Sequence, residues 1–116
     1  MGGTVPYTVF NARKSFIESN PEIIKSFTKA IDKALDYVHN HSAKDVAENI
    51  KDYFKDNSLE EITKVVQRYM DIDAWYSTTY INEEDFNHIQ EIIDNAGELS
   101  KKAPYDKLVT TKYSKK

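Results

Sequence analysis

From Asn20 onward, apolar residues recur every three or four positions, a spacing typical of amphipathic helices and not of strands. Asn20 is a favourable residue before a helix, and Pro21 suits the first helical position because it has no backbone N–H to leave unsatisfied. This pattern predicts a long helix near 21–41. Its apolar stripe consists of Ile23, Ile24, Phe27, Ala30, Ile31, Ala34, Leu35 and Val38.

Three further helices are predicted near 43–56, 59–71 and 83–96. Ser42 precedes the first of them, and Ser58 with Glu61 has the spacing of a capping box. Asn82 precedes an acidic first turn, and Gly97 suits the end of that helix. A very short helix is expected at Pro104. The residues expected to face inward are Val46, Ala47, Ile50, Tyr53 and Phe54, then Ile62, Val65, Val66, Tyr69 and Met70, and finally Phe86, Ile89, Ile93 and Ala96.

One segment differs from this helical pattern. Residues 5–10, Val-Pro-Tyr-Thr-Val-Phe, are rich in β-branched and aromatic side chains and predict a short strand. A lone strand leaves its backbone groups unpaired, so we expect either a partner sheet outside this sequence or self-association with a second copy. Residues 1–4, beginning Met-Gly-Gly, are expected to be an addition from cloning, and the chain is expected to be a fragment of a longer protein.

Composition excludes several classes of function. The 116 residues include no Cys, which removes disulfides, thiol nucleophiles and thiolate metal sites. Only three Gly are present, two of them at positions 2 and 3, so a glycine-rich phosphate loop and a nucleophile elbow are excluded. The sequence contains no run of eighteen apolar residues, the length that a membrane-spanning helix needs, and no export signal is recognisable.

Charge is divided unevenly along the chain. Residues 1–99 carry ten basic and eighteen acidic side chains, whereas 100–116 carry six and one, and we define 110–116 as a basic tail. Nucleic acid and anionic lipid are the partners that such a basic region could contact. The six basic residues are all Lys and the rest of the chain is acidic, so we expect no nucleic-acid partner.

Metal binding and catalysis are not predicted. Asp71 and Asp73 resemble the start of a calcium loop, but Trp75, Tyr76 and Asn82 occupy positions at which such a loop needs an oxygen ligand, Gly and Glu. His39 and His41 lie two positions apart, so on a helix they point to different sides and cannot share a metal as a pair four apart could. We therefore expect no metal, no cofactor and no catalytic residue.

The candidate ligand-binding residues are aromatic. Trp75, Tyr76 and Tyr80 lie in the connection of about ten residues between the third and fourth predicted long helices, which is long for a helix pair. Aromatic side chains on a loop often line a ligand cleft, and they also often fill the gap between helices. Both roles stay open for Tyr76 and Tyr80, whereas Trp75 is predicted to be mainly a packing residue.

The order of several short motifs resembles a known family. Residues 6–10, Pro-Tyr-Thr-Val-Phe, precede Lys-Ser-Phe-Ile at 14–17 and Asn-Pro-Glu at 20–22. Later come Ile-Asp-Ala-Trp at 72–75, Glu-Glu-Asp-Phe at 83–86, Ala-Gly-Glu-Leu at 96–99 and Pro-Tyr-Asp-Lys-Leu-Val at 104–109. Together they resemble the C-terminal third of substrate-binding proteins of ABC importers for sulfonates, nitrate, taurine and thiamine-pyrimidine precursors.

This resemblance implies that residues 5–109 are the C-terminal helical segment of a substrate-binding lobe. The chain would then be mainly α, as the closing segment of an α/β two-lobed periplasmic-binding-protein-like fold with one short N-terminal strand. It also implies a non-enzymatic function: binding a small sulfonate, nitrate or pyrimidine-type solute and delivering it to a permease. The whole protein would be extracellular or periplasmic and membrane-associated, with most of its ligand contacts outside these residues.

Two alternatives compete with this function. The first is an enzyme similar to the pyrimidine synthases of thiamine biosynthesis, which are alike in fold but need a pyridoxal-phosphate site and a reactive histidine earlier in the chain. The second is a free-standing helical module that binds partner proteins through its apolar stripes. The sequence favours neither over the solute receptor.

Overall fold

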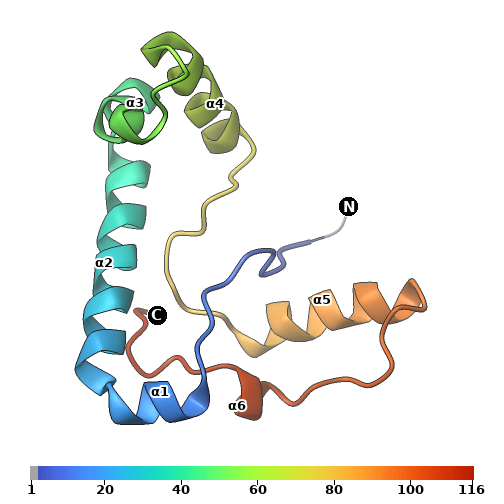
Figure 1. Ribbon diagram of the computed structural model, residues 1–116. Helices are drawn as coiled ribbons and strands as arrows, with labels where there is room; N and C mark the ends of the chain where they lie inside the picture. The colour runs from blue at the N-terminus through green and yellow to red at the C-terminus, as the bar shows by residue number, and fades with distance from the viewer. Residues whose placement is uncertain (1–2) are drawn as a thin grey trace. The chain divides into compact units, whose positions relative to one another are not determined.

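The computed structural model describes residues 3–116, so Met1 and Gly2 lie outside the described residues. Gly3 and Thr4, the remaining residues expected to come from cloning, have no regular secondary structure. The described chain is helical throughout its regular parts (Figure 1). Its helices are α1 (Lys14–Ser19), α2 (Pro21–Asn40), α3 (Ala43–Ile50), the 3-10 turn η1 (Lys51–Tyr53), α4 (Leu59–Asp71), α5 (Glu83–Asn95) and α6 (Tyr105–Leu108).

The predicted helices are confirmed. α2, α4 and α5 begin at the expected residues and end within one residue of the expected positions. The helix expected near 43–56 is shorter, because α3 ends at Ile50 and continues only as the 3-10 turn η1. The short helix after Pro104 is α6. Spacing and capping residues therefore located the helices from local sequence alone.

The predicted strand at residues 5–10 is wrong. No residue between 3 and 116 is in a strand, and Tyr7 and Phe10 are 89% and 73% exposed. β-Branched and aromatic residues favour a strand only where a neighbouring strand accepts their hydrogen bonds and their side chains are covered, and neither condition is met. The expected fold class, an α/β two-lobed fold with an N-terminal strand, is contradicted with it. The strand edge that motivated self-association is absent as well.

Helix α1 was not predicted. Asn20 separates it from α2: the backbone N–H of Asn20 donates to the Phe16 carbonyl at 2.9 Å, and its side-chain amide donates to the same oxygen at 3.0 Å. Pro21 then begins α2, and the Asn20 carbonyl accepts from the N–H groups of Ile23 and Ile24. Asn20 therefore ends one helix and precedes the next.

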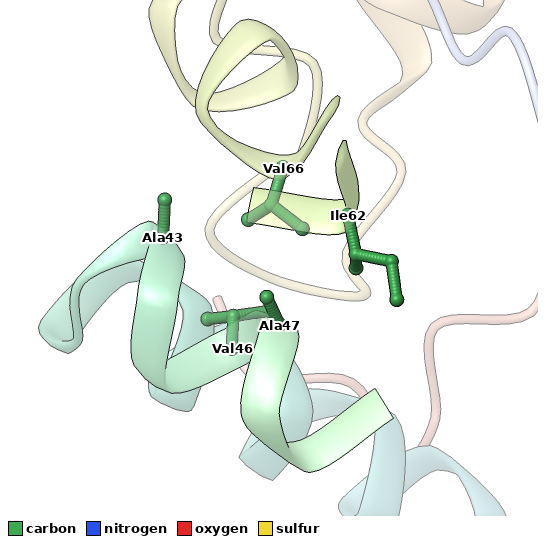
Figure 2. Close-up of a cluster of buried hydrophobic side chains, with 5 residues drawn as sticks. All are labelled: Ala43, Val46, Ala47, Ile62 and Val66. Atoms are coloured by element: carbon green, nitrogen blue, oxygen red, sulfur yellow. The ribbon is translucent and has the colours of Figure 1, made fainter. Parts of the chain in front are cut away.

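The chain divides into two compact units, which are described separately. One unit is residues 27–79, and the other combines the first part of the chain up to residue 26 with residues 80–116. In the unit 27–79, α3 packs against α4 and encloses a small apolar cluster (Figure 2). Its buried members are Ala43, Val46, Ala47, Ile62 and Val66.

Helix α4 has two apolar rows, and only one is buried. Ile62 and Val66 face α3, whereas Val65 and Tyr69 are 56% and 47% exposed, although they were expected to face inward. Residues 62, 66 and 70 form one row of an α-helix, and 65, 69 and 72 form another. The partner helix α3 is only eight residues long and covers a single row. We call the more exposed row, Val65 and Tyr69 with the C-cap residue Ile72, the outer row of α4.

The stripe predicted on α2 is only partly covered: Ile24, Ile31, Leu35 and Val38 are half-buried, and its other four residues are exposed. None of its apolar residues is buried, and Ile23 and Phe27 remain 55% and 44% exposed. The one buried residue of α2 is Asp32, which is 3% exposed and accepts a hydrogen bond from the Thr79 backbone N–H at 3.0 Å. This bond fastens the end of the long connection to α2 within the unit 27–79.

In the other unit, polar contacts hold α5 to the segment that follows it. Gln90 is 6% exposed, and its side chain bonds to both backbone groups of Ala103. Its side-chain oxygen accepts from the Ala103 N–H at 2.6 Å, and its Nε2 donates to the Ala103 carbonyl at 3.2 Å. The Tyr105 hydroxyl donates to the Ile81 carbonyl, and its ring meets that of Phe86 edge-on at 5.6 Å.

Candidate binding site

The site begins where α4 ends. The N–H of Ala74 donates to the Tyr69 carbonyl and that of Asp73 to the Met70 carbonyl, both at 3.0 Å. These two bonds form a Schellman motif, in which the residue after the helix adopts a left-handed conformation. Asp73 has a φ of 51° and occupies the position that glycine most often takes. The turn reverses the chain, so the residues after Asp73 return toward α4.

Trp75 is the first large side chain after that turn. Its ring stacks on Tyr69 with the centroids 5.4 Å apart, and it packs against the apolar cluster of α3 and α4. It is half-buried. The prediction that Trp75 mainly packs therefore agrees with its contacts, and the exposed part of the ring borders the hollow described below.

Two histidines at the end of α2 fix the other side of the site. Nε2 of His39 donates to the carbonyls of Trp75 and Tyr76, at 3.0 and 3.3 Å. Nδ1 of His41 donates to the Tyr37 carbonyl at 2.9 Å, and the His41 ring stacks on the Tyr37 ring at 3.7 Å. Because all these acceptors are carbonyl oxygens, each histidine carries its proton on the named nitrogen.

Between the end of α2 and the end of α4 lies a hollow of about 180 Å³. Both sides belong to the unit 27–79. Its lining mixes aromatic, histidine and carboxylate side chains and includes no Lys or Arg. We call it the His39–Trp75 hollow, and it is lined by Val38, His39, His41, Tyr69, Met70, Asp73, Ala74 and Trp75.

The three aromatic residues proposed from the sequence are divided between the two units. Trp75 lines the hollow, whereas the Tyr76 side chain is 47% exposed and only its carbonyl takes part, through His39. Tyr80 belongs to the other unit, where the Lys116 ammonium lies 5.6 Å from its ring centroid. Sequence reasoning missed His39, His41 and Asp73 as neighbours of Trp75, because their proximity depends on the turn after α4.

The neighbourhood of Tyr80 affects Tyr105. Burial of the Tyr105 hydroxyl raises its pKa, and the nearby Tyr80 and Glu83 raise it further. A phenol in this setting stays protonated at neutral pH and donates to the Ile81 carbonyl. This group holds α6 to the start of α5 and is structural in its contacts.

A second, more polar hollow lies in the same unit as Tyr80. It is lined by Gly3, Thr4, Glu84, Asp85, Asn87, His88 and Glu91. Nδ1 of His88 lies 3.9 Å from a Glu91 carboxylate oxygen. Within residues 3–116, no group of three or more histidine and carboxylate side chains is arranged to hold a metal ion. In the same range, no helix has both the length and the apolar character that a membrane span requires.

Comparison with known proteins gives one informative relative. Over 114 residues, 98% of this chain, the sequence is 40% identical to a protein of Bacillus subtilis (strain 168) named "Putative binding protein YtlA". The alignment covers 34% of that protein, so the chain spans about a third of the length of this relative. The printed name gives that protein a binding role and specifies no ligand. No family model and no solved structure matches the chain.

Proposed function

We propose that this chain is a helical part of a larger binding protein. The observation that carries the proposal is the 40% identity, over nearly the whole chain, to one third of a relative whose name describes binding. The uncovered apolar surface on α2 and the outer row of α4 supports it, because large apolar side chains at such positions are usually covered by further chain or by a partner.

The finer part of the proposal concerns the solute and its destination. We propose that the whole protein is the non-enzymatic solute receptor of an ABC importer, working on the outer side of the membrane and delivering its ligand to a permease. The candidate ligands are a sulfonate, nitrate or a pyrimidine-type precursor. Support comes from the ordered sequence motifs, including Ile-Asp-Ala-Trp at 72–75, where the residues form the turn and ring that border the His39–Trp75 hollow.

A second candidate function is a helical interaction module. The outer row of α4 favours it, because Val65, Tyr69 and the C-cap residue Ile72 follow one another along one side of α4 and are all about half exposed or more. Such rows at positions i, i+4 and i+7 are the anchors by which helices dock into partner grooves. In this case the uncovered face would bind another protein directly.

Titration of the whole protein containing these residues separates the two functions. Under the solute-receptor proposal, calorimetry with taurine, alkanesulfonates, nitrate and aminopyrimidines should show micromolar binding of one of them. Ligand at a hundredfold its dissociation constant should stabilise the protein by about 2.7 kcal/mol, measurable as a raised melting temperature. Failure of every solute, together with loss of partner binding on Val65→Ser, would favour the interaction module, because Val65 lies on the outer row and does not line the hollow.

A further inference from the structure

The His39–Trp75 hollow offers mainly hydrogen-bond acceptors and aromatic surface. We infer that it binds a small, flat organic cation, one that carries N–H donors on an aromatic or conjugated frame. This inference concerns the hollow itself and stands or falls separately from the proposed transport role. Three features carry it: the position of the proton on each neutral histidine ring, the charge of Asp73, and the stacked rings of Tyr69 and Trp75.

The histidine hydrogen bonds decide what the ring nitrogens can do. Nε2 of His39 and Nδ1 of His41 already donate to carbonyl oxygens. In a neutral imidazole the other nitrogen carries a lone pair and accepts. Each neutral histidine therefore has one ring nitrogen that can still accept a hydrogen bond, and an N–H group of a ligand can donate it.

Asp73 supplies the negative charge. Asp73 is one of the residues that line the hollow, and its side chain has no hydrogen bond or ion pair to another residue in the described range 3–116. The Schellman turn fixes its backbone at the edge of the hollow through the bond from its N–H to Met70. The turn therefore fixes the backbone of Asp73, while its side chain is free to rotate toward a ligand in the hollow.

The aromatic pair supplies the flat surface. Stacked rings present electron-rich faces that attract a cation, and Trp gives the strongest such attraction. The indole N–H of Trp75 and the Tyr69 hydroxyl are neutral donors, but no cationic side chain lines the hollow to stabilise an anion. An anionic ligand would meet the Asp73 carboxylate without compensation.

Size limits the ligand to about one ring. The hollow measures about 180 Å³, and an apolar cavity of about 150 Å³ is known to hold benzene. A ligand of nine or ten heavy atoms on a partly open surface is expected to bind with a dissociation constant on the order of 1 mM. Tighter binding would need a further wall.

Three probes of nearly equal shape test the charge preference: benzamidinium, neutral benzamide and anionic benzoate. Trp75 is the only tryptophan of the chain, so its fluorescence reports directly on the hollow. At about pH 8, benzamidinium should bind at least roughly tenfold more tightly than benzoate, with benzamide between them. Amide NMR shifts should move at Asp73 and Trp75. Equal affinity for benzoate, or no response at Trp75, would overturn the inference.

Two variants locate the effect. Asp73→Asn removes the charge but keeps the left-handed turn, because Asn tolerates that conformation well. It should weaken benzamidinium binding about tenfold. The matched control is Asp71→Asn, which removes a carboxylate two residues away that accepts from Gln67 and does not line the hollow. The control should leave benzamidinium binding unchanged. An equal loss of affinity in both variants would mean that benzamidinium responds to the overall negative charge of the protein, and it would refute the site.

A separate result distinguishes this inference from the proposed function. If the whole protein binds a sulfonate or nitrate while the Trp75 fluorescence and amide shifts stay fixed, the solute-receptor proposal stands and the hollow is not a cation site. If benzamidinium binds the hollow and no solute binds the whole protein, the reverse holds. Circular dichroism of each variant confirms that the helices are intact.

Discussion

The two units of this chain are held together by different forces. Residues 27–79 contain all five buried apolar residues of the described chain, gathered between α3 and α4. The other unit, in its described residues 3–26 and 80–116, has one buried residue, and that residue is the polar Gln90. One unit is thus organised by hydrophobic burial and the other by a few specific hydrogen bonds.

The difference follows from what each set of helices can cover. α3 presents the small residues Ala43 and Ala47 to α4, which allows the two helices to approach closely and exclude water. Within the described residues of its own unit, α5 packs against the four-residue α6, and its apolar residues Ile92 and Ile93 stay about 40% exposed. The unit 27–79 should therefore be the more stable of the two. The other unit depends on the side-chain hydrogen bonds of Gln90 and Tyr105.

Cavity formation in the apolar cluster should have the largest effect. Ile62→Ala removes buried methyl and methylene groups from the face of α4 toward α3 and should cost about 3 kcal/mol of stability. The control is Val65→Ala on the outer row of the same helix, which should change stability by less than about 0.5 kcal/mol. Amide exchange in α3 and α4 measures both. Comparable losses would mean that the outer row is also covered.

Loss of the two hydrogen bonds between Gln90 and Ala103 should have the second-largest effect on stability. Gln90→Ala leaves the Ala103 N–H and carbonyl without their partners and should cost about 2 kcal/mol, confined to the unit that contains α5. The amide of Ala103 should then exchange faster, while the amides of α3 and α4 should not change. Gln67→Ala, which removes an exposed amide bonded to Asp71, is the matched control. Faster exchange in both units would contradict their separate organisation.

The helices were predictable because their signals are local. Ser42, Ser58 and Asn82 each accept a hydrogen bond from the backbone N–H three residues later, as their spacing predicted. The strand at 5–10 was not predictable in the same way, because a strand forms only where a partner strand elsewhere accepts its hydrogen bonds. The row of α4 that stays exposed depends on the length of α3, which periodicity alone does not determine.

The hollow was only partly predictable, for a similar reason. Trp75 stood out as an aromatic residue on a long connection, but its neighbours His39 and His41 are more than thirty positions away in sequence. The link between them depends on Asp73 in a left-handed conformation, and Gly, the usual marker of that conformation, is not present there. The sequence predicted a helix ending near Asp71, but it did not predict the Schellman turn that brings Trp75 back toward α4.

Loss of a capping hydroxyl should affect stability less than Ile62→Ala or Gln90→Ala does. The Ser42 Oγ accepts from the Asp45 N–H at 3.1 Å, and Ser58 makes the equivalent bond to Glu61 at 3.2 Å. Ser42→Ala should destabilise α3 by about 1 kcal/mol, measured as faster exchange of the Asp45 amide. Ser42→Asp should restore most of the loss, because a carboxylate oxygen can accept the same bond. No change on Ser42→Ala would show that packing against α4 alone sets the start of α3.

The smallest expected effect is a difference in acid response between the two units. The Ser42 hydroxyl, and then its N–H, donates to Asp45 and lowers the pKa of that carboxyl, and the Ser58 N–H, then its hydroxyl, does the same for Glu61. A folded pKa below the unfolded one adds stability above the unfolded value, near pH 4, and this stability is lost as the pH falls through the folded pKa. The first turns of α3 and α4 should therefore open as the pH falls below about 4.

The cap of α5 provides the comparison. There the neutral side-chain oxygen of Asn82 accepts from the Asp85 N–H at 2.7 Å, and an amide does not titrate in this range. Amide exchange measured between about pH 5 and pH 3 should show protection of Asp45 and Glu61 falling while that of Asp85 changes less. In Ser42→Ala the pKa of Asp45 should rise toward its ordinary value, since its two donors are reduced to the backbone N–H. Equal acid sensitivity of all three amides would mean that general charge repulsion, and not the two capping carboxylates, controls the response of residues 27–79 to acid.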